Sequence, residues 1–233
     1  MTWRVPRCVK PGGDRVTGFD LVVDDVVHRR DGSLVVVRVG EETIDIGLRA
    51  VGMAAVDAAL AHLALLLDEG ATLPIAAEAV ALASADIAGR TARRYLSNRA
   101  LLLDDTAART ALDVRASLRV LADLTREGGR SIAVLGELDS EPHEWFDDHD
   151  ALGRIIVRLD VAQLVVVGHG ARHIHNAAGL EGSWDGESIL VDTLEQAYDV
   201  VRAQVDEGDV VLVSAASRTP LAPLVERLLE ADR

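Results

Sequence analysis

Residues 163–178 read QLVVVGHGARHIHNAA: a short aliphatic run, two glycines around a histidine, and a stretch with helical character. An apolar run of this length before glycine is typical of a buried strand, and the stretch after it is typical of a helix. The same order recurs after four other apolar runs, at 100–103, 131–135, 188–191 and 210–213. Because parallel strands need long crossover connections, usually helices, these repeats predict a Rossmann-like parallel sheet flanked by helices.

The chain before these repeats has a different pattern. Residues 1–18 contain several Pro and Gly residues and little periodicity, which predicts a flexible N-terminal arm. Short β-branched runs from residue 19 to 46, separated by Asp-Gly and Gly-Glu pairs, predict a small antiparallel sheet, and helical stretches follow at 50–67 and from Pro74 to about residue 85. We therefore expect an α/β protein with a small α+β unit over 19–97 and the parallel-sheet domain over 98–233.

Composition argues against several classes of function. The formal net charge of -14 repels nucleic-acid phosphates, so we expect no nucleic-acid partner. Cys8 is the only cysteine, which rules out an intrachain disulfide and is typical of a reducing compartment. The sequence has no signal-peptide pattern at its start and no apolar run of the roughly 18 residues that span a bilayer. We expect a soluble, cytoplasmic protein without a membrane span.

Polar residues and glycines follow several of the predicted strands. Ligands of a doubly wound sheet bind beyond the carboxyl ends of its strands. The candidate ligand-binding residues there are Asp104, Asp105, Gly136, Glu137, Ser217 and Arg218, together with Arg90. Arg90 or Arg218 would bind an anion bidentately, although arginines at 90, 93 and 94 are also typical of a solvated face. Asp104 and Asp105 have two open interpretations, as ligand-binding groups and as the N-cap of the next helix.

Two further motifs have simpler explanations than a cofactor or a metal. Gly168-His169-Gly170 stands where a dinucleotide-binding loop begins, but His173 occupies the place of its third glycine, so a tight turn into a helix is favoured. His169 and His173 share a helix face, as two zinc ligands do. No cysteine or carboxylate completes that set nearby, which favours surface histidines, and we predict no metal site.

The sequence lacks the usual means of cleaving a nucleotide. It contains no G-x-x-x-x-G-K-S/T motif, and Lys10 is its only lysine. Phosphoryl transfer needs positioned cations and a backbone cradle on the β- and γ-phosphates. We therefore predict no catalytic residues for this reaction in these 233 residues.

Several motifs occur here in an order known from one enzyme family. They are a strand ending in Asp104-Asp105, a turn at Gly136-Glu137, His149 with Gly153, the stretch 167–174, and the strand 208–213 followed by Ser217-Arg218. In this order they resemble the C-terminal part of the Mur ligases, in particular the members that add D-alanyl-D-alanine. Gly89-Arg90 is similar to the Gly-Arg that ends the central domain of that family. The sequence departs from the family at residues 107–110, which stand in place of Asn-Ala-Asn-Pro, and in having no counterpart of most of the central domain with its P-loop.

The resemblance implies the Mur ligase fold, and we weigh three hypotheses of function. The first is a truncated Mur ligase homologue that is non-catalytic alone and acts as a binding or regulatory module. The second is the C-terminal subunit of a split ATP-dependent acid–amino-acid ligase of peptidoglycan synthesis. That subunit would use ATP and Mg²⁺ only if a P-loop-bearing Mur-like partner supplied the P-loop, and self-association is the other partner hypothesis. The third is an unrelated small-molecule enzyme on the same fold.

Overall fold

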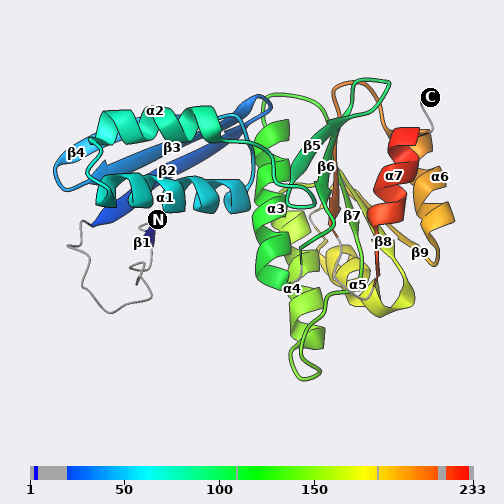
Figure 1. Cartoon of the computed structure of the whole chain (residues 1–233). Helices are drawn as coiled ribbons and strands as arrows, with labels where there is room; N and C mark the ends of the chain where they lie inside the picture. Colours follow the sequence, from blue (N-terminus) through cyan, green and yellow to red (C-terminus); the bar gives the residue numbers. More distant parts are fainter. Residues whose placement is uncertain (1–2, 5–19, 109, 183, 215–218, 231–233) are drawn as a thin grey trace. The chain divides into compact units, whose positions relative to one another are not determined.

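The computed structural model describes residues 3–4, 20–108, 110–182, 184–214 and 219–230 (Figure 1). The chain divides into two compact units, residues 1–87 and 88–233, and each is described by itself. None of the helices among the described residues is both long enough and apolar enough to cross a membrane.

The first unit is a four-stranded antiparallel sheet with two helices. Its strands lie in the order β1 (Trp3–Arg4), β2 (Leu21–Arg29), β3 (Gly32–Val39) and β4 (Glu42–Leu48), followed by α1 (Met53–Asp68) and α2 (Leu73–Ala83). Alternate residues of β3, such as Val35 and Val37, are buried in one core with Leu60 and Leu63 of α1, which is the period of a half-buried strand. The predicted antiparallel sheet is confirmed. Apart from Trp3 and Arg4, the predicted N-terminal arm lies outside the described residues.

The second unit alternates strands and helices, as predicted. Its elements are β5 (Ala92–Tyr95), β6 (Leu101–Asp105), α3 (Ala111–Thr125), β7 (Ser131–Leu135), α4 (Trp145–Arg158), β8 (Gln163–Val167), a 3-10 turn η1 (His169–Ala171), α5 (Arg172–Leu180), β9 (Glu187–Val191), α6 (Leu194–Gln204), β10 (Val210–Ser214) and α7 (Ala222–Glu230). Two helices begin at a capping box, which is formed by Thr110 at the start of α3 and by Thr193 at the start of α6.

The sheet of this unit has the order β5-β6-β10-β7-β8-β9. Strands β6 to β10 run parallel, which confirms the predicted Rossmann-like sheet. Strand β5 was not predicted and runs antiparallel to β6. Its sequence, Ala-Arg-Arg-Tyr, has no apolar run, so its pattern did not predict a strand. Pairing with Leu101–Asp104 stabilises the strand instead, and Arg94 is left exposed at the sheet edge.

The helices cover both faces of the sheet (Figure 1). Helices α3, α4 and α5 connect strands that advance from β6 through β7 and β8 to β9, whereas α6 leads back from β9 to β10 and packs beside α7. One core joins α6 and α7 to the sheet; its members include Ile132, Val165, Val213, Val201 and Leu224. Right-handed crossovers in opposite directions place their helices on opposite faces, as observed here.

Helices α4 and α5 pack with their backbones close together at Gly153. A Cβ on Gly153 would lie 2.7 Å from the Cβ of Ala177 and closer still to the carbonyl oxygen of Ile174. Gly153 is buried at this contact, whereas a Cβ on Gly179 of α5 would have no neighbouring atom within 4 Å.

We predict that Gly153→Ala lowers the free energy of unfolding by about 1–3 kcal/mol, because overpacking outweighs the gain of about 1 kcal/mol in helix propensity. Gly179→Ala is the matched control and should raise it by up to about 1 kcal/mol. Urea unfolding of both variants measures these changes. A stabilised Gly153→Ala variant would contradict the close packing of α4 on α5.

Candidate functional site

The carboxyl ends of β6, β10 and β7 form the switch point of the parallel sheet. The chain leaves β6 and β7 toward α3 and α4 on one face, but it leaves the intervening β10 toward α7 on the other. Crevices at such points are where ligands bind in open α/β sheets. We call the residues at this edge the strand-tip site, which comprises Arg90, Asp105, Gly136, Glu137, Ser214 and Thr219.

Asp105 is the central titratable group of the strand-tip site. It is 2% exposed, its Oδ1 accepts a hydrogen bond from the Thr91 backbone N–H at 3.1 Å, and its Oδ2 accepts one from the Ser214 hydroxyl at 2.8 Å. Burial raises the pKa of Asp105 to about 6, against hydrogen bonds from Ser117 and Ser214 that lower it. A carboxyl group that titrates near neutral pH at a strand tip is a candidate functional group, although its bonds also join three segments of the chain.

Arg90 lies in the turn that Asp105 anchors. Its Nη2 forms an ion pair with Asp113 at 2.8 Å, and its Nη1 donates to the Ala107 carbonyl at 3.4 Å. The next residue, Thr91, has a φ of 55°, which is strained for a β-branched residue. The structure thus brings Arg90 to the predicted edge of the sheet, with part of its charge already neutralised by Asp113.

Asp104 does not cap a helix. Its Oδ1 accepts hydrogen bonds from the Thr106 N–H at 3.1 Å and the Thr106 hydroxyl at 2.7 Å, which closes a local turn. Helix α3 begins only at Ala111, with Thr110 as its N-cap. Of the two open interpretations of Asp104 and Asp105, the N-cap is therefore wrong.

Gly136 and Glu137 meet the chain that leaves β10. The Glu137 N–H donates to the Thr219 hydroxyl at 3.2 Å, and a Cβ on Gly136 would lie 2.8 Å from the Cβ of Thr219, so only glycine fits there without a shift. The Glu137 carboxylate accepts a hydrogen bond from the Trp145 indole at 3.1 Å and lies against Gly170. The remaining predicted residues, Ser217 and Arg218, lie outside the described residues.

His149 positions the loop that carries Glu137. It is fully buried; its Nε2 accepts a hydrogen bond from the Leu138 N–H at 3.0 Å, and its Nδ1 lies 2.6 Å from the Trp145 carbonyl. Since an N–H must donate to Nε2, the ring is neutral with its proton on Nδ1. Burial lowers the pKa of His149, against the hydrogen bond to Trp145.

The three histidines after β8 have different neighbours, and one of them shares Trp145 with His149. His173 packs edge-on against Trp145 and Phe146, with ring centroids 5.1 and 4.8 Å apart, and His175 bonds to the Ser188 hydroxyl at 2.7 Å. His169 begins the turn η1. Within the described part of the chain no three His, Cys, Asp or Glu side chains are grouped to hold a metal ion.

Comparisons with known proteins decide the ancestry. The family model "Mur ligase, glutamate ligase domain" matches residues 89–217, which is more than half of the chain. The chain belongs to the Mur ligase family. It is 36% identical over 167 residues to the UDP-N-acetylmuramoyl-tripeptide--D-alanyl-D-alanine ligase of Mycobacterium leprae, covering 65% of this chain and 32% of that enzyme. The corresponding ligase of Mycobacterium tuberculosis is 34% identical over 147 residues, covering 56% of this chain and 29% of that enzyme.

Solved Mur ligases share the fold. The MurF ligase of Thermotoga maritima, solved in complex with ADP, matches with a TM-score of 0.73 and 20% identity, over 93% of this chain and 47% of that chain. MurF of Acinetobacter baumannii gives a TM-score of 0.70 and 20% identity, over 92% and 46% of the two chains. This chain spans about a third of the length of the curated relatives it matches.

The pKa of Asp105 predicts a pH-dependent stability. The folded state binds the proton of Asp105 more tightly than the unfolded state does. The stability that this proton contributes is therefore complete below about pH 3.8 and is lost as the pH rises through about 6. At about 1.4 kcal/mol for each pKa unit, the loss is roughly 3 kcal/mol. Asp105→Asn has the same shape without the charge. The difference in unfolding free energy between this variant and the wild type should grow in favour of the variant from pH 4 to pH 7, and a difference that is constant with pH would contradict the buried charge.

The buried, neutral His149 predicts a second pH dependence of stability, opposite in sign to that of Asp105. Its pKa is lower in the folded state, so stability falls as the pH drops below the ordinary histidine pKa of 6.5. His149→Leu leaves the buried Leu138 N–H without its acceptor and should cost about 1–3 kcal/mol at pH 8, whereas His149→Gln keeps an acceptor and should cost less. Chemical unfolding at pH 8 and pH 5.5 tests both effects. Equal losses in the two variants would show that the hydrogen bond from Leu138 contributes little.

Proposed function

We propose that this chain acts as the ligand-binding C-terminal lobe of a Mur-type ligase. It binds a nucleotide or peptide at the strand-tip site and by itself does not catalyse a reaction of that ligand. The observation that carries the proposal is the cluster of Asp105, Ser214 and Arg90 at the switch point of a Mur ligase domain. The absence of a P-loop motif from these 233 residues supports the proposal that the chain alone is not catalytic.

The residues of this edge suit the organic part of a nucleotide better than its metal. Carboxylates at strand tips accept hydrogen bonds from ribose hydroxyls in related folds, and Arg90 offers a planar cation to phosphate. ATP, when bound, would supply the phosphoryl group that activates a carboxylate. Mg²⁺ finds no group of three carboxylate or histidine ligands among the described residues, so a magnesium site is not proposed here.

A second candidate function is the C-terminal subunit of a split ATP-dependent ligase of peptidoglycan type. The ligase activity in the names of the mycobacterial relatives favours it. A P-loop-bearing Mur-like chain would then complete the enzyme in the cytoplasm, and self-association is the other partner hypothesis. A neighbouring gene for such a chain would distinguish this function from a regulatory module. Membership of the Mur ligase family removes the support for an unrelated small-molecule enzyme.

We predict that the isolated chain binds ATP weakly and neither hydrolyses it nor joins amino acids. One arginine that stabilises the transition state can contribute about 10³ to 10⁵ in rate, and the cradle and lysine of the P-loop are absent from this sequence as well. Calorimetric titration with ATP and Mg²⁺, beside a phosphate-release assay, measures binding and turnover separately.

Two arginine variants form a matched pair for this titration. Arg90→Gln should weaken ATP binding by about tenfold through loss of a charged hydrogen bond, whereas Arg94→Gln, on the exposed edge of β5, should not. Turnover that vanishes in Asp105→Ala or Arg218→Ala would show that the chain is catalytic by itself. ATP binding that is equal in all variants would contradict the strand-tip site.

A further inference from the structure

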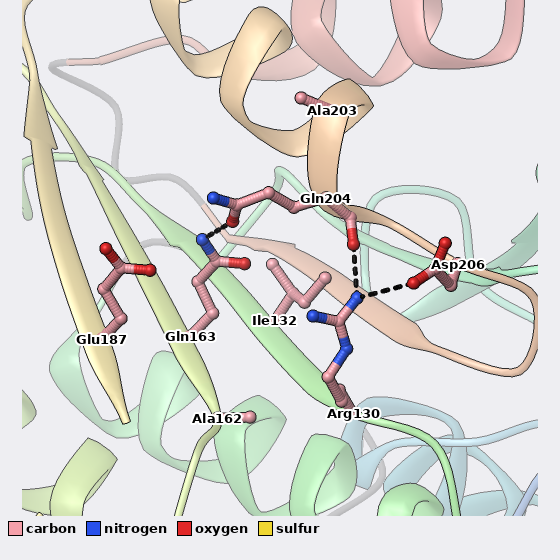
Figure 2. Close-up of a pocket in the computed structure, with 8 residues that line it drawn as sticks. All are labelled: Arg130, Ile132, Ala162, Gln163, Glu187, Ala203, Gln204 and Asp206. Carbon is pink, nitrogen blue, oxygen red and sulfur yellow. Dashed lines mark hydrogen bonds and ion pairs between the residues drawn. The ribbon is translucent and has the colours of Figure 1, made fainter. Parts of the chain in front are cut away.

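Two features of the molecule lie outside the strand-tip site. One is a cavity of about 380 Å³ at the amino-terminal edge of the parallel sheet. There Arg130 bonds to Asp206 and to the Gln204 carbonyl, and the Gln163 amide donates to the Gln204 side chain, so these polar groups are paired with one another (Figure 2). The other feature is the outer surface of α1 and α2 in the first unit.

Helices α1 and α2 each have a second apolar stripe, on the side away from the sheet. Their inner sides, with residues such as Leu60 and Val80, fill the core of the first unit. We call the residues of the second stripes together the outer stripe, which comprises Ala54, Ala58, Ala61 and Leu65 in α1 and Ile75, Ala79 and Leu82 in α2. Its large members, Leu65, Ile75 and Leu82, are 49, 63 and 66% exposed. A helix that covers one sheet needs one apolar side, whereas a helix that is apolar all round is usually enclosed on both.

The outer stripe has the spacing of a helix-packing seam. Its positions 54, 58, 61 and 65, and likewise 75, 79 and 82, are separated by alternating steps of four and three residues, as the a and d positions of a heptad are. Helices α1 and α2 pack against each other and are joined only by residues 69–72, so they form an antiparallel pair. The small side chains of Ala58, Ala61 and Ala79 allow a further helix to pack closely on this pair.

The charged residues of this helix pair are acidic. No lysine or arginine occurs from residue 50 to 89, whereas the same stretch contains Asp57, Asp68, Glu69, Glu78 and Asp86. Arg49, just before it, bonds to the Leu82 carbonyl at the end of α2. A second copy of the chain would bring two acidic surfaces together, and an anionic lipid surface would be repelled. The charge of this face therefore favours a partner with cations beside its apolar side chains.

We propose that the outer stripe binds an amphipathic helix of another protein, with aliphatic residues along one side and lysine or arginine next to them. Such a helix lays its apolar side on the partner through anchors at heptad spacing. It buries Leu65, Ile75 and Leu82, and its cations meet Glu78. From residue 54 to 65 the stripe is about 16 Å long at 1.5 Å per residue, so a helix of about 14 residues covers it. The inference rests on the first unit alone and is independent of both proposed functions.

Amide NMR titration of the whole chain with a synthetic peptide tests the proposal. The peptide has about 14 residues, with leucine at the a and d positions and lysine elsewhere. Saturable shifts are expected at residues 54–65 and 75–82. A peptide with glutamate in place of lysine should bind at least about tenfold more weakly, because its charges repel those of the acidic face. Equal binding of the two peptides, or shifts confined to the acidic segment 137–150, would overturn the proposal.

Exposed aliphatic residues provide the matched variants. Ile75→Gln and Leu82→Gln should each weaken binding of the lysine peptide by about tenfold, because one aliphatic side chain is no longer buried in the complex. Leu180→Gln, at the end of α5, changes a side chain that is 84% exposed outside the outer stripe and should leave binding unchanged. The dispersion of the NMR spectrum shows whether each variant is folded. Folded Ile75→Gln and Leu82→Gln variants that bind like the wild type would refute the role of the outer stripe.

Other occupants of this face are distinguished by measurements without the peptide. Sedimentation equilibrium of the chain should show no dimer that Ile75→Gln dissociates, and flotation with phosphatidylcholine vesicles should show no binding that it abolishes. Substitution of Arg7 and Lys10 by glutamine should not shift the amide signals of residues 54–65 and 75–82. The opposite result in any of these measurements would overturn the proposal in favour of a second copy, a lipid surface or the chain's own N-terminal residues, respectively.

Discussion

The buried carboxyl group of Asp105 connects three segments that are far apart in the sequence. Its two oxygens accept hydrogen bonds from the turn at Thr91 and from Ser214 at the end of β10, which is 109 residues away. A carboxyl group at this depth is unfavourable as an anion, and its pKa of about 6 reflects that cost. The order of the strand tips therefore depends on a group whose charge is only partly compensated, as is common at functional sites.

The rest of this edge is built around the same strand. Ser214 bonds to Asp105 through its hydroxyl and accepts the Gly136 N–H through its carbonyl at 3.4 Å, so β10 joins the tips of β6 and β7. Thr219 and His149 then fix the loop after β7 from two sides. Loops held on a rigid scaffold in this way can present side chains to a ligand with little loss of conformational freedom on binding.

Sequence periodicity was enough to predict every strand of the parallel array, because each contains at least three consecutive aliphatic residues, as in 164–167. It did not predict β5, whose arginines carry no apolar signal, or the strand order, which depends on long-range pairing. Positions at strand ends pointed to Asp105 and Gly136. They did not reveal Thr91 or Thr219, since a strained φ and a backbone-to-hydroxyl bond over 82 residues leave no local pattern in the sequence.

The two edges of the sheet are fixed by different kinds of charge. At the carboxyl edge a buried acid receives neutral donors and its pKa is raised, whereas at the amino edge Asp209 receives a full cation from Arg130 and its pKa is lowered. An ion pair of that kind keeps its geometry over the whole neutral pH range, while the strand tips change charge within it. Because the strands between these edges are buried and close-packed, the same rigid sheet holds the ion pair at one edge and the buried acid at the other.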